Sequence, residues 1–124
     1  MKISKEQFEK LVAETLDDLP EKFKNKLYNV AIFTKNYPDK KQLKKLGIRR
    51  GETLFGLFEG YAQARRLNFG PVLPDRITIF RRPISKHCSN EQEIKEKITN
   101  TVKHEIAHHF GSDEKGARRA GRRP

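Results

Sequence analysis

The sequence predicts a single α+β domain, in which a small β-sheet packs with an N-terminal helix and a long C-terminal helix. Patterns of helical period occupy both ends of the 124-residue chain, and three short runs of β-forming residues lie between them. Strands framed by terminal helices favour an α+β domain over a doubly wound parallel sheet. The length suits one core and leaves no room for a separate substrate domain.

The first expected element is a helix that begins after Ser4. Ser4 and Gln7 have the spacing of a capping box, in which two side chains bind the backbone at the start of a helix. An amphipathic stripe follows and ends before Pro20. The stripe consists of Phe8, Leu11, Val12, Leu16 and Leu19.

Three strands are expected in the middle of the chain. Residues 28–34 (YNVAIFT) and 53–59 (TLFGLFE) are rich in β-branched and aromatic residues. Gly56 within the second run indicates a bulge or a close approach of another segment. Polar and apolar residues alternate over residues 76–80 (RITIF), which form the third expected strand. Pro83 prevents the strand from continuing.

The last expected element is the longest helical pattern of the chain. Ser89 and Gln92 have capping-box spacing, and the acidic residues around them complement the positive N-terminal end of a helix. Apolar residues then recur every four positions, which gives the helix one buried side. They are Ile94, Ile98, Val102, Ile106 and Phe110.

The opposite side of this helix carries the most informative motif, His-Glu-x-x-His at residues 104–108. Because His104 and His108 are four residues apart, their imidazoles lie on one helix face about 6 Å apart and can bind one metal ion. Glu105 lies about 100° further round, where it can hold a water molecule and take its proton. A core histidine would lie on the apolar stripe, and neither of these does.

The residues after the helix extend the motif. Gly111 comes three residues after His108, where a left-handed residue can end a helix and turn the chain back. Asp113 and Glu114 follow, and either carboxylate can supply a third ligand. Two histidines, one carboxylate and an open water position are typical of a catalytic zinc site. The alternative is a surface helix that carries its histidines by chance.

With these residues the chain resembles a family of small bacterial zincin-like metallopeptidases with a minimal metzincin-type site. Residues 57–60 (LFEG) and 73–83 (LPDRITIFRRP) match the same family. The resemblance implies a zincin-like domain over residues 1–116, in which a small sheet lies beside the active-site helix. It also implies a peptide or protein substrate that adds as a strand to an exposed sheet edge.

The resemblance further implies the roles of single residues. It assigns His104, His108 and Glu114 to Zn²⁺ and Glu105 to catalysis. Metzincins proper have a histidine at the third ligand position, whereas a carboxylate suits the short version of the motif. Asp113 stays an alternative third ligand, because a shift of one residue in the turn would put Asp113 in the place of Glu114.

Two further roles stay open. Zincins often bind the developing oxyanion with a residue beyond the third ligand. Arg118 and Arg119 lie there, and His109 is an alternative that points about 100° away from its neighbour on the helix. The edge strand for substrate would be either residues 53–59 or residues 76–80.

The chain is strongly basic, with 27 Lys+Arg against 16 Asp+Glu and a net charge of +11. Residues 35–50 hold seven basic residues and one acid, and residues 117–124 form an arginine-rich tail that we expect to be flexible. Such charge predicts non-specific binding of polyanions, since no recognised nucleic-acid motif accompanies it.

The charge also defines an alternative function, a non-catalytic binding protein on a zincin scaffold. Its basic surfaces would contact nucleic acid, the ribosome or an acidic protein. Glu105 favours the enzyme, because a purely structural metal site has no use for a carboxylate at that position.

Location and redox state follow from simpler features. The chain has no apolar signal region near Met1 and no apolar run of membrane-spanning length, so we expect a cytoplasmic protein with no membrane contact. A single cysteine, Cys88, suits a reducing compartment. It adjoins His87, but neighbouring loop residues rarely have nucleophile–base geometry, and we expect no catalytic role for the thiol.

Overall fold

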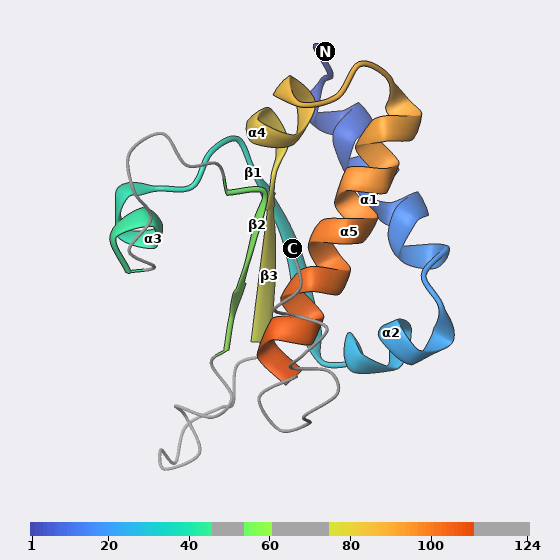
Figure 1. Cartoon of the computed structure of the whole chain (residues 1–124), viewed down its shortest axis with the longest axis vertical. Helices are drawn as coiled ribbons and strands as arrows, with labels where there is room; N and C mark the ends of the chain where they lie inside the picture. Colours follow the sequence, from blue (N-terminus) through green and yellow to red (C-terminus); the bar gives the residue numbers. More distant parts are fainter. Residues whose placement is uncertain (46–53, 61–74, 111–124) are drawn as a thin grey trace.

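A computed structural model describes residues 1–45, 54–60 and 75–110 (Figure 1). Its elements in chain order are α1 (Lys5–Asp17), α2 (Glu21–Lys26), β1 (Val30–Lys35), α3 (Lys40–Lys45), β2 (Gly56–Glu59), β3 (Asp75–Phe80), α4 (Arg81–Lys86) and α5 (Glu91–Phe110). The predicted α+β class is confirmed, with a mixed sheet, an N-terminal helix and a long C-terminal helix.

The strands form one sheet in the order β1-β3-β2. β3 lies in the centre, parallel to β1 and antiparallel to β2, so that Ile77 pairs with Ile32 on one side and with Phe58 on the other. Of the two strands expected to offer an edge, residues 76–80 are therefore internal and β2 lies at the edge of the described sheet.

The helices divide unequally between the two faces of the sheet. Figure 1 shows α1, α2 and α5 together on one face and, of the described helices, α3 on the other. α5 packs against α1, β2 and β3, and the main core fills the space between this helix layer and the sheet. The core residues with no exposed surface are Phe8, Ile77, Ile79, Ile84, Ile94, Ile98 and Val102.

α5 forms as its apolar stripe predicts, but its cap is shifted by one residue. Asn90 Oδ1 accepts a hydrogen bond from the N–H of Glu93 at 2.9 Å, and Glu93 Oε1 accepts one from the N–H of Ser89 at 2.6 Å. The cap is therefore Asn90 rather than Ser89. The buried stripe runs from Ile94 to Ile106, and the side chain of Phe110 lies outside the described part of the structure.

The start of α1 is confirmed in part. Ser4 Oγ accepts a hydrogen bond from the N–H of Gln7 at 3.1 Å, as the capping box predicts. The Gln7 amide does not close the box and instead donates to Glu91 Oε2 at 2.9 Å. This bond joins the first turns of α1 and α5.

Three short helices, α2, α3 and α4, are not predicted by the sequence patterns. In α3, Asp39 Oδ1 accepts from the N–H of Gln42 at 2.7 Å while Gln42 Oε1 accepts from the N–H of Asp39 at 3.0 Å. This reciprocal capping starts a helix inside the basic segment. α4 contains Pro83 in its first turn, where a proline leaves no helical hydrogen bond unmade.

No helix in the described part of the chain is long and apolar enough to cross a bilayer. The longest is α5, and the alternation of charged residues with its buried stripe accounts for this.

Candidate active site

His104 and His108 project from one face of α5. Both side chains lie outside the buried core, and their ring centres lie 5.9 Å apart with the rings inclined by 22°. Since the isoleucine stripe of α5 is buried on the core side, the two imidazoles face away from the core, as the helical spacing predicts. They form a pair of nitrogen donors one helical turn apart, which suits one metal ion.

Glu105 lies between the histidine pair and the edge of the sheet. Its Oε1 accepts a hydrogen bond from the backbone N–H of Phe58 in β2 at 2.9 Å. Phe55 O accepts a hydrogen bond from Phe80 N, so the backbone groups of Phe55 face β3. Because backbone groups alternate in direction along a strand, those of Phe58, three residues later, face away from β3. The carboxylate therefore binds the outer edge of the sheet.

The surroundings of Glu105 change its acidity. The side chain is half-buried, and burial raises the pKa of Glu105 above its ordinary value. The hydrogen bond from Phe58 and the charges of His104 and His108 lower that pKa, but less than burial raises it.

The contact with β2 gives Glu105 a structural use. Glu105 joins α5 to the edge strand, so a carboxylate at this position has a use in the fold beside the catalytic one that the sequence favours. One oxygen, Oε1, makes this bond. A carboxylate has a second oxygen, and Oε2 can accept a hydrogen bond from a water molecule.

β2 and α5 approach closely at two glycines. A Cβ atom at Gly56 would lie 2.5 Å from Cγ2 of Thr101, and one at Gly60 would lie 3.0 Å from Cε1 of His109. Gly56 therefore marks a close approach, one of the two alternatives that its position in a strand predicts. The small residues let the edge strand lie directly beside the motif.

His109 packs against the strand. Its ring stacks on Phe58 with the centres 3.7 Å apart and the planes inclined by 20°. This contact fixes His109 on the β2 side of the helix, apart from the outer face that carries His104 and His108. The other residues considered for the oxyanion, Arg118 and Arg119, lie outside the described residues.

A groove adjoins the motif. It has a volume of about 560 Å³ and lies between residues 54–56 and the α5 side chains of Lys97, Asn100, Thr101, His104 and Glu105. The Nζ of Lys97 lies 4.7 Å from the ring centre of Phe55, so one wall combines an aromatic ring with a cation. Sequence reasoning did not identify Lys97, which has no motif of its own.

The third metal ligand falls beyond the described residues. Asp113 and Glu114 both lie there, and residues 1–45, 54–60 and 75–110 contain no group of three or more His, Cys, Asp or Glu side chains that could hold a metal. The two imidazoles supply nitrogen donors of the kind that Zn²⁺ prefers, so the donor chemistry present fits this ion.

Cys88 is separate from the groove and is buried, with 5% of its surface exposed. Burial raises the pKa of the Cys88 thiol above its ordinary value. The neighbouring His87 places Nδ1 3.0 Å from Pro83 O and packs its ring edge-on against Phe55 at 5.1 Å. The His87 ring is thus engaged by Pro83 and Phe55.

The fold is similar to that of a conserved hypothetical protein from Thermus thermophilus, with a TM-score of 0.60. The two chains are 22% identical, and the match covers 88% of this chain and 95% of the other. No curated protein matches the sequence. The model of a family described as Zincin-like metallopeptidase matches residues 27–121, which include the His-Glu-x-x-His motif. The chain therefore belongs to the zincin-like metallopeptidase family.

Proposed function

We propose that this chain is a zinc-dependent peptidase that hydrolyses peptide bonds in the groove beside β2. One observation carries the proposal. The Glu105 carboxylate is held at 2.9 Å by the edge-strand N–H of Phe58, next to the pair His104 and His108, at the end of the groove. A carboxylate, a pair of imidazoles and a strand edge thus meet in one place, which supports the proposal.

The metal would be held by His104, His108 and either Glu114 or Asp113. When bound, Zn²⁺ would supply a Lewis acid that activates water and polarises the substrate carbonyl. The family implies zinc, and the two imidazoles on one helix face support its binding here.

Glu105 would carry the proton transfers. Its Oε1 is fixed by Phe58, so the orientation of the carboxylate is set before substrate arrives. Oε2 would then accept a proton from the attacking water and later return it to the leaving amine. A half-buried position limits competing solvent around this carboxylate.

The substrate would lie along the N-terminal part of β2. The N–H of Phe58 already donates to Glu105. The next residue of β2 whose backbone groups face away from β3 is Gly56, which lines the groove and would form the main-chain hydrogen bonds with substrate. Leu54 and Phe55 supply apolar surface there, and Asn100 and Thr101 supply polar groups from α5.

The variant Glu105→Gln tests zinc binding and peptide cleavage separately. Glutamine keeps a carbonyl oxygen that can accept from Phe58 and loses the base. We expect unchanged zinc stoichiometry by calorimetric titration and no cleavage of a peptide library that the wild type cleaves. The control is Glu96→Gln, a residue of the same helix that lies outside the groove. Equal cleavage by Glu105→Gln and wild type would rule out Glu105 as the base.

Binding without catalysis is the second candidate function. The observation in its favour is the bond from Phe58, which gives Glu105 a role in holding the fold together. A wild-type protein that binds zinc and cleaves no member of a broad peptide library would support this candidate.

A further inference from the structure

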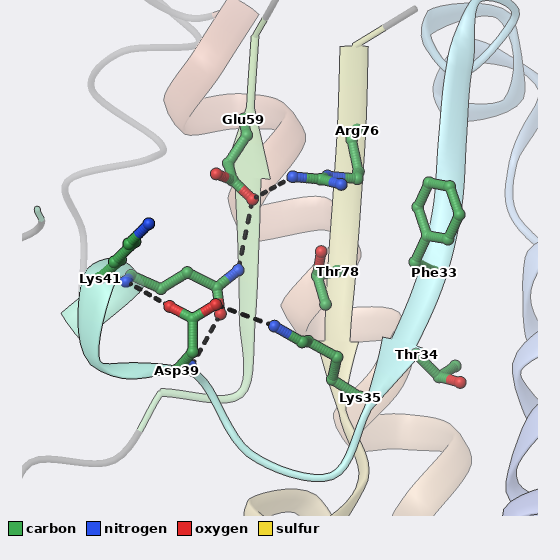
Figure 2. Close-up of a pocket in the computed structure, with 9 residues that line it drawn as sticks. Phe33, Thr34, Lys35, Asp39, Lys41, Glu59, Arg76 and Thr78 are labelled. Atoms are coloured by element: carbon green, nitrogen blue, oxygen red, sulfur yellow. Dashed lines mark hydrogen bonds and ion pairs between the residues drawn. The ribbon is translucent and has the colours of Figure 1, made fainter.

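A second cavity lies on the face of the sheet opposite α5. It has a volume of about 460 Å³ and is formed by all three strands together with α3 (Figure 2). Thr78 of β3 lies at its floor, with Phe33 on the β1 side and Lys41 on the α3 side. No residue of the His-Glu-x-x-His motif lines it, so it is a different site from the groove beside β2.

A network of polar bonds holds the rim of this cavity. Lys35 Nζ lies 3.0 Å from Asp39 Oδ2, and Arg76 Nη2 lies 3.3 Å from Glu59 Oε1. The amide of Gln42 donates to the same Glu59 oxygen at 3.3 Å. Figure 2 shows these contacts following one another from β1 through α3 to β2 and β3. Of these contacts, the bond between Gln42 and Glu59 joins α3 to β2.

An exposed aromatic ring forms one wall. Phe33 of β1 has 50% of its surface exposed. Its pairing partner on β3, Thr78, is only 2% exposed. The guanidinium of Arg76 lies 5.7 Å from the centre of the ring. Beyond the end of β1, Tyr37 is 47% exposed and has Lys86 Nζ 5.1 Å from its ring centre. Two accessible rings with cations beside them thus follow one segment of the chain.

The charge around the cavity is positive. Lys35, Lys41 and Arg76 line it together with two carboxylates, Asp39 and Glu59, and both carboxylates are engaged in the rim bonds. α3 adds further lysines to the same region. Exposed ion pairs such as Lys35–Asp39 contribute little to stability, so Lys35 can exchange its partner for a phosphate at small cost.

We propose that this sheet face binds single-stranded nucleic acid, with a base stacked on Phe33 and the adjacent phosphates held by Lys35 and Lys41. Ring stacking with flanking cations is how proteins bind unpaired strands without reading sequence. A duplex keeps its bases stacked on each other, and an acidic peptide has no flat ring to cover Phe33. The cavity has room for one nucleotide-sized group. This inference does not depend on the peptidase activity, since the two sites are lined by different residues.

The chain contains no tryptophan, which provides a direct probe. Phe33→Trp places a single fluorophore in the cavity and keeps a ring that can stack. Tyr28→Trp is the matched control, because Tyr28 is 94% exposed and does not line the cavity. On titration with oligo(dT) or oligo(U), we expect the indole emission of Phe33→Trp to fall by about half, while the control probe changes little.

Binding of a labelled oligonucleotide, followed by anisotropy, tests the contribution of each group. We expect Phe33→Ala to weaken binding about tenfold, and Phe33→Leu to do the same, since leucine keeps apolar bulk without a ring. Lys41→Gln should reduce the slope of log K against log salt by about 0.7, and Lys24→Gln on α2 should leave it nearly unchanged. Circular dichroism and thermal unfolding check that each variant is folded.

Several outcomes would overturn the proposal. Equal quenching of the two tryptophan probes would show that binding is not at this cavity. Equal quenching of the Phe33→Trp probe by polyglutamate would mean that the face recognises acidic peptide, and equal affinity for a duplex of the same length would exclude stacking. Absence of oligonucleotide binding at about 50 mM salt, where charge contacts are strongest, would also reject it.

Discussion

The N–H of Phe58 donates to Glu105 across 47 residues of sequence, and this bond joins the edge strand of the sheet to the helix that carries His104 and His108. The bond sets the distance between a strand edge and a pair of imidazoles. The buried stripe of α5 sets which side of the helix faces the core, and this bond adds a polar contact between the motif and β2. The same carboxylate thereby links the fold to the proposed chemistry.

Loss of this bond should destabilise the protein more than loss of the charge. We expect Glu105→Ala to lower the free energy of unfolding by about 1–3 kcal/mol, because the half-buried N–H of Phe58 loses its acceptor. Glu105→Gln should cost less, since its amide oxygen can take the same bond. Urea denaturation of the two variants measures the difference, and similar losses in both would contradict the assigned role of the bond.

Metal binding should depend on both histidines of the motif. We expect His104→Ala and His108→Ala each to abolish tight zinc binding and Glu114→Ala to weaken it, because ligand number sets affinity. Affinity should also fall as the pH is lowered, because zinc binds deprotonated ligands and competes with protons for them. Calorimetric titration gives the stoichiometry. Zinc uptake by the double histidine variant equal to that of the wild type would disprove the site.

The contact between β2 and α5 at Gly56 leaves no space for a methyl group. In Gly56→Ala the new Cβ would lie 2.5 Å from Thr101 Cγ2 and 3.2 Å from Thr78 O, so we expect a loss of about 1–3 kcal/mol in the free energy of unfolding. Thr101→Ser removes Cγ2, and the double variant should recover part of the loss. A double-mutant cycle measures the coupling, and strict additivity would show that the clash is relieved elsewhere.

Acid stability should depend on Asp39. The N–H of Gln42 and, after it, Lys35 lower the pKa of this carboxyl below its ordinary value of 3.8. A folded pKa below the unfolded one means that Asp39 contributes stability above about pH 4 and loses it as the pH falls through the lowered pKa. The free energy of unfolding should therefore fall less steeply between about pH 5 and pH 2 in Asp39→Asn than in the wild type. Parallel urea titrations of the two proteins over this range provide the measurement.

The parts predicted correctly from sequence have local causes. The isoleucine stripe fixes which side of α5 is buried, and helix geometry then places His104 and His108 opposite it. The predicted cap differs from the observed one by one residue because Ser89 and Asn90 both have a suitable residue three positions later. Local pattern alone does not choose between two adjacent caps.

The parts that sequence did not predict arise from long-range contacts or from short elements. α2, α3 and α4 have six residues each, too few for a helical period to be visible. The donor to Glu105 is a backbone N–H, which any residue other than proline at position 58 would supply. The cavity lined by Phe33 depends on the parallel register of β1 with β3. This register pairs Phe33 with Thr78, which lies 45 positions later in the sequence.

The position of β3 in the sheet also determines when the site can form during synthesis. Both edge strands, β1 and β2, precede the strand that joins them, and they pair with β3 and not with each other. A nascent chain that ends at residue 60 therefore lacks the strand with which both of them pair. Pairing of β1 waits for residues 75–80, and such distant contacts slow folding. The histidine face of α5 is synthesised after all three strands, so the sheet edge that binds Glu105 can form before the motif reaches it.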